Sequence, residues 1–311
     1  MKRFFIYLLA VLIPIAIALG IGEWCVRSVE NTYSFKRKIM LLNHEKTETL
    51  VLGASHTYFG IKPDLLDGNA ISLAFVSQQP KYDEFLLKQV EYPCLKNVIL
   101  GISYSTFFND RLENKDVWYM AMYYKIYMHY PEHSDFSYYN YEFFDMDNYR
   151  KKLGHFFRGE DVVDCDLYGW GRSYSLEKKN MKKWNDEDCG VATEEDQRGK
   201  WPEAERFAQG HLATVTRIAD FCAQKGARLI LVTTPCHDKY TRLLKQHQLR
   251  RMHELISDIM KTHDVTYLDY LYDKRFGDDD FFDVDHLSDV GAVKFTKLLN
   301  ADIQRTASTA H

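Results

Sequence analysis

The sequence predicts an α/β protein whose parallel sheet carries helices on both faces. Short apolar runs of strand length alternate with helical patterns, and this order occurs near the start of the chain and again near its end. The apolar runs lack the polar alternation of a half-exposed strand, which is typical of a buried parallel sheet. The expected strands span 47–53, 70–75, 97–102, 228–233 and 265–268. The expected helices span 82–92, 203–225, 243–262 and 288–303, the last with Ser288 as its N-cap.

The N-terminal segment is apolar enough to cross a membrane. Residues 4–22 carry no charged side chain and follow two basic residues directly. As a helix they would be about 28 Å long, which is close to the hydrocarbon thickness of a bilayer. Trp24 suits the membrane interface at the end of such a helix. We therefore expect a transmembrane anchor over 1–22, followed by a stem over 23–45.

The orientation of this anchor is not decided by charge, because basic residues flank the apolar stretch at both ends. A short N-terminal tail before a single anchor is typical of a signal anchor, which places the rest of the chain outside the cytoplasm. We therefore expect a single-pass membrane protein with a periplasmic or extracellular main domain. A cleaved signal peptide is the alternative, since Ala16-Ile17-Ala18 matches the small-residue pattern of a cleavage site.

The middle of the chain, residues 111–199, is rich in Tyr, Phe, Trp, Asn and Asp and has no clear strand pattern. We expect it to be an insertion that forms a lid or a wall of a binding site. The sheet domain would then comprise 46–110 and 200–306. Cys165 and Cys189 both lie in the insertion, and a disulfide between them and two unpaired thiols are equally open.

Charge and cysteine usage exclude some partners and cofactors. The chain has 40 Lys and Arg against 44 Asp and Glu, a net charge of -4, so its overall charge gives no reason to expect a nucleic-acid partner. The 6 cysteines include no CxxC pair and no zinc-like spacing with histidines. We predict no metal and no cofactor.

Two segments far apart in the sequence carry the candidate chemistry. Ser55 follows the first strand in Leu52-Gly53-Ala54-Ser55, and Asp283 and His286 lie three residues apart just before the last helix. A serine hydroxyl needs a base within hydrogen-bond distance, and that base needs a third group to orient it. Ligands of open α/β sheets bind at the carboxyl ends of the strands, where the two segments would meet. We therefore predict a catalytic group of Ser55, His286 and Asp283.

Several neighbours are rivals or additions to this group. His56 is expected to pack at the start of a helix, with a substrate contact as the alternative. Asp285 competes with Asp283 as the orienting acid, but its adjacency to His286 makes that geometry awkward. Cys236 follows a strand end and is a second candidate nucleophile, although nothing in the sequence suggests a lowered thiol pKa.

On these motifs the sequence resembles the SGNH or GDSL-like hydrolases and their acyltransferase relatives. The similar segments are LVLGASHTYFGIKPD, residues 50–64, and FFDVDHLSDVGAVKF, residues 281–295. The layout is similar to that of membrane-anchored members such as alginate O-acetyltransferases and the D-alanyl transfer protein of teichoic-acid synthesis. The resemblance implies a flavodoxin-like three-layer α/β/α sandwich and an acyl-enzyme mechanism. It also implies that the backbone N–H of Ser55 contributes to an oxyanion hole.

The sequence departs from the family pattern at the other oxyanion donors. The family's second-block glycine would fall near Ser77 or Gln78, where no glycine occurs. Its third-block Gly-x-Asn-Asp finds only Gly101-Ile102-Ser103-Tyr104-Ser105. Backbone N–H groups, Gln78 or Ser105 are the possible replacements.

The function expected from these observations is acyl transfer or ester hydrolysis, of the O-acetyl type, on a glycan or other cell-envelope polymer. The aromatic insertion motivates the glycan, because Trp and Tyr faces stack on sugar rings. A membrane protein that donates the acyl group would be the partner of a transferase. The alternative is a non-catalytic envelope-assembly or glycan-binding protein. The usual α/β-hydrolase fold is disfavoured, since position 57 is Thr where its motif has Gly.

Overall fold

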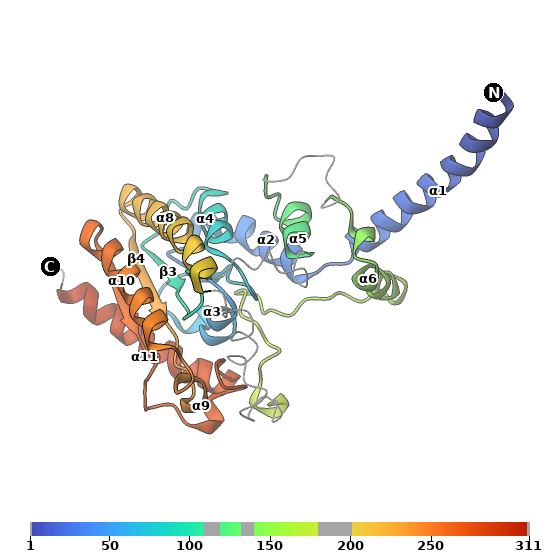
Figure 1. Cartoon of the computed structure of the whole chain (residues 1–311). Helices are drawn as coiled ribbons and strands as arrows, with labels where there is room; N and C mark the ends of the chain where they lie inside the picture. Colours follow the sequence, from blue (N-terminus) through green and yellow to red (C-terminus); the bar gives the residue numbers. More distant parts are fainter. Residues whose placement is uncertain (1, 109–118, 132–139, 180–200, 310–311) are drawn as a thin grey trace. The chain divides into compact units, whose positions relative to one another are not determined.

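The computed structural model describes residues 2–108, 119–131, 140–179 and 201–309 (Figure 1). The chain forms two compact units. One comprises residues 1–38 and 112–164, and the other comprises residues 39–111 and 165–311. The segment expected to be one insertion is thus divided between the units after residue 164. Cys189, the possible disulfide partner of Cys165, lies outside the described residues.

The larger unit contains a sheet of five parallel strands in the order β2-β1-β3-β4-β5. This is the flavodoxin-like strand order of doubly wound α/β folds, which confirms the predicted fold class. The strands are β1 Thr49–Leu52, β2 Ala70–Ser72, β3 Asn97–Gly101, β4 Arg228–Thr233 and β5 Val265–Asp269. In register, Val51 lies beside Ser72 and Ile99, and Ile99 lies beside Ile230.

Helices cover both faces of this sheet and complete the three-layer α/β/α sandwich (Figure 1). The helices α4 (Pro80–Lys88), α8 (Trp201–Lys225) and α10 (Gln246–Thr262) pack side by side in one layer. The helices α3 (Ser55–Gly60) and α11 (Asp289–Thr309) pack together in the other. A short helix, α9 (Asp238–Thr241), follows the end of β4. All five expected strands and all four expected helices of this domain are present; the strand over 228–233 has the expected bounds, and at least one end of each of the others is shifted.

Two details of the expected elements depend on local chemistry. Ser288 caps α11, because its Oγ accepts a hydrogen bond of 3.2 Å from the backbone N–H of Gly291, as predicted. The expected strand over 70–75 ends early, at Ser72, although the backbone N–H groups of Leu73 and Phe75 still donate hydrogen bonds to the carbonyls of Val51, at 2.9 Å, and Gly53, at 3.1 Å.

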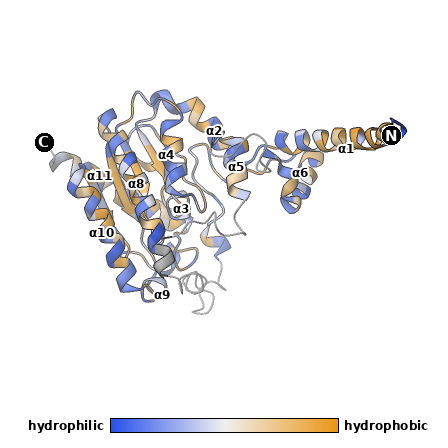
Figure 2. Cartoon of the chain, turned by 45° about the horizontal axis from the view of Figure 1, so that its top comes forward, coloured by the Kyte–Doolittle hydropathy of each residue, from blue (hydrophilic) through white to orange (hydrophobic). Residues whose placement is uncertain are grey.

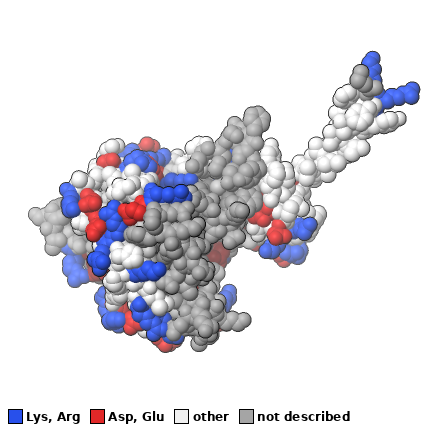
Figure 3. Space-filling view, viewed as in Figure 1, with Lys and Arg blue, Asp and Glu red and all other residues white. Residues whose placement is uncertain are grey.

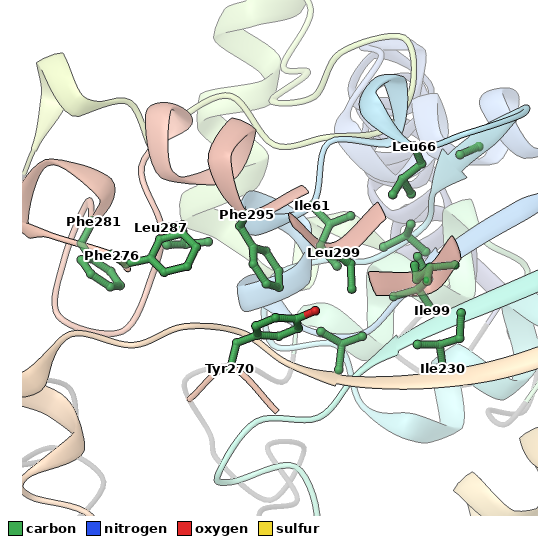
Figure 4. Packing of buried hydrophobic residues seen from close by; sticks show 14 residues of the cluster. Ile61, Leu66, Ile99, Ile230, Tyr270, Phe276, Phe281, Leu287, Phe295 and Leu299 are labelled. Atoms are coloured by element: carbon green, nitrogen blue, oxygen red, sulfur yellow. The ribbon is translucent and has the colours of Figure 1, made fainter. Parts of the chain in front are cut away.

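The core that holds α11 on the sheet is a cluster of buried aliphatic and aromatic side chains (Figure 4). Strand residues Val51, Ile99 and Ile230 meet Phe295 and Leu299 of α11 there, and all five are fully buried. The segment before α11 packs into the same cluster through Phe281 and Leu287, which are also buried. The loop that carries Asp283 and His286 is thus fixed at both of its ends.

The smaller unit contains α1 (Lys2–Ser28), α5 (Tyr119–Tyr127) and α6 (Met146–Arg158), and α2 (Thr32–Asn43) begins in it. Helix α1 is long and apolar enough to cross a membrane; its most apolar window has a mean hydropathy of 2.8, and none of that window is buried in the protein. The helix continues six residues beyond the expected anchor end at Gly22. An ion pair between Glu23 and Arg27, one helical turn apart, lies in this extension.

Candidate active site

The turn after β1 places Ser55 at the first residue of α3 and depends on two glycines. Gly53 has a φ of +116°, which side chains rarely adopt, and a Cβ there would lie 2.9 Å from the backbone N of Gly101. A Cβ on Gly101 would lie 2.3 Å from Cγ2 of Thr57. Thr57 in turn donates a hydrogen bond of 2.9 Å to the carbonyl of Ala54. The ends of β1 and β3 therefore approach closely only because both residues lack a side chain.

The structure brings the three predicted residues together although they come from opposite ends of the domain. The Nε2 atom of His286 lies 2.8 Å from Oγ of Ser55, and its Nδ1 atom lies 2.9 Å from Oδ1 of Asp283. The same carboxylate oxygen accepts hydrogen bonds from the backbone N–H groups of His286, at 2.8 Å, and Asp285, at 3.3 Å. Asp283 is buried. The carboxylate is therefore fixed in place, and it directs the Nδ1 proton of His286 away from Ser55.

A second His–Asp pair lies against this group. Asp285 has Oδ1 at 3.2 Å from Nδ1 of His286 and Oδ2 at 3.5 Å from Nε2 of His56. The His56 and His286 rings are stacked, with centroids 4.5 Å apart and an interplanar angle of 25°. Adjacency was expected to make Asp285 an awkward orienting acid. Its carboxylate nevertheless reaches Nδ1 of His286, while the hydrogen bonds from the backbone N–H groups of the loop go to Asp283. His56 packs at the start of α3 as expected, and its packing partner is His286.

Burial and neighbouring charges act in opposite directions on these groups. Burial lowers the pKa of His286, but the carboxylates of Asp283 and Asp285 outweigh it and raise this pKa to about 10. Burial and the charge of His286 lower the pKa of His56. Burial disfavours the charge of Asp285, yet His286 and His56 hold its pKa well below the usual range. Burial, together with Asp285 and Asp283, raises the pKa of Cys236 well above that of an ordinary thiol, which goes against Cys236 as a nucleophile.

An aromatic stack forms one wall of the site. Tyr174 lies between the rings of Phe59 and Phe282, with centroids 3.7 Å and 4.1 Å away, and it meets His286 edge-on at 5.2 Å. Trp170 holds Phe59 in place, since its Nε1 donates a hydrogen bond of 2.7 Å to the carbonyl of Phe59. None of these aromatic residues was a predicted site residue. Tyr174 and Trp170 belong to the aromatic-rich segment 111–199, and Phe59 and Phe282 lie within the two motifs that carry Ser55 and His286.

Gln78 lies behind the Ser55 turn. Its Nε2 donates a hydrogen bond of 2.5 Å to Oδ1 of Asp83, and the same oxygen accepts one of 2.8 Å from the backbone N–H of Gly53. Burial raises the pKa of Asp83 to about 7. Asp83 was not predicted, because nothing in the sequence connects the middle of α4 with the end of β1. Gln78 therefore braces the turn through Asp83.

The remaining oxyanion candidates follow β2 and β3. Ser77, where the family pattern has glycine, adopts a φ of +57°, so the backbone there has the conformation that glycine favours. The hydroxyl of Ser105 lies 3.4 Å from that of Ser103, in the turn that ends β3. Ser55 is the first residue of α3, so its own backbone N–H lies next to its Oγ and is the donor closest to the candidate nucleophile in the chain.

Metal binding at this site would disrupt the hydrogen bonds that define it. Among the described residues, His56, Asp285 and His286 offer ligand atoms within 4.8 Å of one another. Each nitrogen of His286 already lies within hydrogen-bond distance of Asp283 or Ser55. A metal ion bound to either nitrogen would have to displace Asp283 or Ser55 from His286. The arrangement therefore suits proton transfer between Ser55 and His286 better than metal coordination.

Comparisons with known proteins add little to this geometry. No protein-family model matches the chain, and no curated protein matches it. One solved structure that resembles it is described as "a putative platelet activating factor from Streptococcus pneumonia". The two share 11% sequence identity, and the match covers 92% of this chain and 98% of that one with a TM-score of 0.45.

Proposed function

We propose that this protein is a membrane-anchored serine enzyme that transfers or hydrolyses an acyl ester through an acyl-Ser55 intermediate. The observation that carries the proposal is the continuous line of hydrogen-bond distances from Ser55 through His286 to Asp283. This order of nucleophile, base and orienting carboxylate activates a serine on several unrelated folds. The resemblance of both motifs to the SGNH or GDSL-like hydrolases supports the same reaction class.

In the proposed reaction, Oγ of Ser55 attacks the carbonyl carbon of the ester while its proton passes to Nε2 of His286. The tetrahedral oxyanion accepts a hydrogen bond from the backbone N–H of Ser55. Collapse of the oxyanion breaks the bond to the leaving alkoxide, which takes the proton from His286 and departs as an alcohol. Water or a sugar hydroxyl then gives its proton to His286 and attacks the acyl-enzyme, and Ser55 recovers its proton as the acid or the new ester leaves.

Asp283 and Asp285 have different roles in this proposal. Asp283 orients His286, because it holds both the ring Nδ1 and the backbone N–H of the same residue. Asp285 adds a second negative charge and a second hydrogen-bond acceptor 3.2 Å from the same Nδ1, and both raise the pKa of His286. Only neutral His286 can take the proton of Ser55, so we expect the reaction to accelerate with rising pH up to about 10.

The substrate we propose is an O-acylated glycan or another polymer of the cell envelope. Helix α1 would anchor the enzyme at the membrane, with the site on its outer side. The aromatic composition of residues 111–199 favours a glycan as the polymer. A reporter enzyme fused to the C-terminus tests the orientation. A reporter that is active only in the cytoplasm would contradict it.

A non-catalytic role in envelope assembly is the second candidate. It is favoured by the absence of the family's side-chain oxyanion donors and by the contact of Gln78 with Asp83. A protein of this kind would keep the fold and the hydrogen bonds of Ser55 without turnover.

Labelling of the detergent-solubilised full chain by a fluorophosphonate probe separates the two candidates, because the probe reacts with an activated serine whether the enzyme is an esterase or a transferase. We expect labelling of the wild type and of the remote control Ser308→Ala, and none of Ser55→Ala. Labelling that survives Ser55→Ala would reject Ser55 as nucleophile, and an unlabelled wild type would favour the non-catalytic role. Steady hydrolysis of an aryl acetate would then indicate an esterase, whereas an acyl-enzyme discharged only by sugar hydroxyls would indicate a transferase.

A further inference from the structure

Helix α6 crosses the end of the apolar helix α1 at a steep angle. The hydroxyl of Tyr149 approaches the backbone of α1 at Gly22, and the ring of Phe156 meets Trp24 edge-on at 6.0 Å. These contacts lie about 3 Å apart along α1 but about 10 Å apart along α6, at 1.5 Å per residue. Figure 2 shows the same relation, with α6 running across the line of α1. If α1 crosses a bilayer, α6 therefore lies close to the plane of its surface.

A buried ion pair fixes α6 in this orientation. Nζ of Lys152 lies 2.6 Å from Oε2 of Glu142, and both side chains are buried. The hydroxyl of Tyr127 accepts a further hydrogen bond of 2.6 Å from Lys152. The backbone N–H of Glu142 donates to Oε1 of Glu23, on α1, at 2.9 Å. Because removing one partner of a buried pair is costly, α6 and the end of α1 are expected to move as one piece.

Large apolar side chains remain exposed on α6, just before it and at the adjoining end of α1. The exposed fraction is 77% for Phe157, 66% for Trp24 and 50% for Phe144. Trp24, Phe156 and Phe157 form a continuous line of ring contacts, which joins α6 to the end of the apolar span. Aromatic rings at this level of a membrane helix are typical of the lipid–water interface.

The geometry points to α6 as a membrane-surface helix, with Phe157, Phe144 and Trp24 inserted at the boundary between lipid headgroups and acyl chains. The inference rests on the membrane anchoring proposed above and adds a second contact with the same bilayer. Figure 3 shows α1 free of charged side chains up to its N-terminal tip, while charged side chains gather at its other end around α6. That change from apolar to charged surface marks the level of the interface.

The charges around α6 are balanced, so the helix should contact lipid through its apolar side chains rather than through charge. The exposed basic residues Arg150, Lys151 and Arg158 are balanced in number by the exposed acidic residues Asp147, Glu160 and Asp161, and Glu160 accepts a hydrogen bond of 2.8 Å from Nε of Arg158. Attraction to anionic lipids is therefore weak, and burial of the apolar side chains supplies the interaction. Contact with lipid should consequently be the same in zwitterionic and in anionic membranes.

Photocrosslinking of the full chain in lipid vesicles tests the inference. p-Benzoylphenylalanine replaces Phe157 on the apolar side of α6, Lys151 on the polar side of the same helix, or Leu12 in the middle of α1; all three positions are exposed. Vesicles of phosphatidylcholine alone, and of phosphatidylcholine with phosphatidylglycerol, are irradiated, and lipid adducts are counted by mass spectrometry. Circular dichroism verifies that each variant keeps its helical content.

We expect adducts at positions 12 and 157 at similar yield, several-fold fewer at position 151, and no change with phosphatidylglycerol. Adducts at position 12 with none at 157 would overturn the surface helix and leave the anchor intact. Their absence at position 12 would overturn the anchor and the surface helix together. Equal yields at 151 and 157 would also overturn the inference, because a helix that lies on the surface has one lipid face.

Discussion

Replacing Asp285 with Asn should make Ser55 more reactive at neutral pH, although it removes a carboxylate from the site. With a pKa of about 10, only about one His286 in a thousand is neutral at pH 7. Asp285 is one of the two carboxylates that raise this pKa, and it forms none of the hydrogen bonds that Asp283 makes to the backbone N–H groups of its loop. Its removal should therefore enlarge the neutral fraction without releasing the ring from Asp283.

The size of the effect follows from the separation of the two charges. At 3.2 Å and an effective dielectric constant of 20, the Coulomb attraction between Asp285 and protonated His286 is about 5 kcal/mol, which is an upper limit. Opposite charges this close commonly change a pKa by about 1–3 units. The pH at which reactivity reaches half its maximum should fall by that amount in Asp285→Asn. Reactivity at pH 7 should rise by about tenfold or more.

The assay is the second-order rate constant of fluorophosphonate labelling between pH 5 and pH 11. Asp283→Asn is the matched control, because it removes the same charge together with the orienting hydrogen bonds, and its rate should fall by about 10²–10⁴. A rate for Asp285→Asn that falls in the same way would refute the reasoning, since Asp285 would then orient His286. An unchanged pH midpoint would refute it too, because Asp285 would then not raise the pKa of His286.

Three further predictions concern the scaffold. Burial raises the pKa of Asp83 from 3.8 to about 7, so the folded state holds this proton more tightly than the unfolded one; stability should fall by up to about 4 kcal/mol as pH rises from about 4 to about 7. In Asp83→Asn the melting temperature should change less with pH over this range. An unchanged pH dependence would contradict the raised pKa of Asp83. Gly101→Ala should cost about 1–3 kcal/mol and slow labelling of Ser55, with partial rescue by Thr57→Ser, which removes the clashing methyl group; failure of the rescue would point to another cause. Leu299→Ala should lower stability by about 2–5 kcal/mol in denaturant titrations and leave labelling of the folded protein unchanged, and a smaller loss would show that the core refills the space.

The fold could be predicted because its signals are local. A buried parallel strand is a short apolar run and a surface helix is an amphipathic one, so the strand Arg228–Thr233 and the helix that ends at Lys225 were found at or near their true bounds. The N-cap at Ser288 is equally local, since the hydroxyl and the N–H that it accepts from lie three residues apart. The ends of β2 and α1 were less predictable, because they depend on where neighbouring segments pack.

The sequence predicted those residues of the candidate site whose place follows from the position of a motif. It did not predict those that tertiary packing brings to the site. Ser55 follows the first strand, and His286 precedes the last helix, so a parallel sheet of this strand order brings them to one edge. Their distance of 2.8 Å is a result of the tertiary structure alone. The roles of Gln78 and Ser105 stay predictions, as does the identity of the remaining oxyanion donors.

The sequence by itself determined the parallel α/β sandwich, the apolar N-terminal helix and the residue types of the candidate site, because each follows from a pattern of residues that are neighbours in the chain. Only the tertiary structure decided the surroundings of His286. Asp285 lies beside its Nδ1 atom, His56 stacks on its ring, and Tyr174 reaches it from the aromatic segment. His56 and Tyr174 come from segments far from His286 in the chain, so no local pattern could place them. The pKa of His286 depends on its burial and on how closely the neighbouring carboxylates of Asp283 and Asp285 approach the ring, and both follow from the folded geometry.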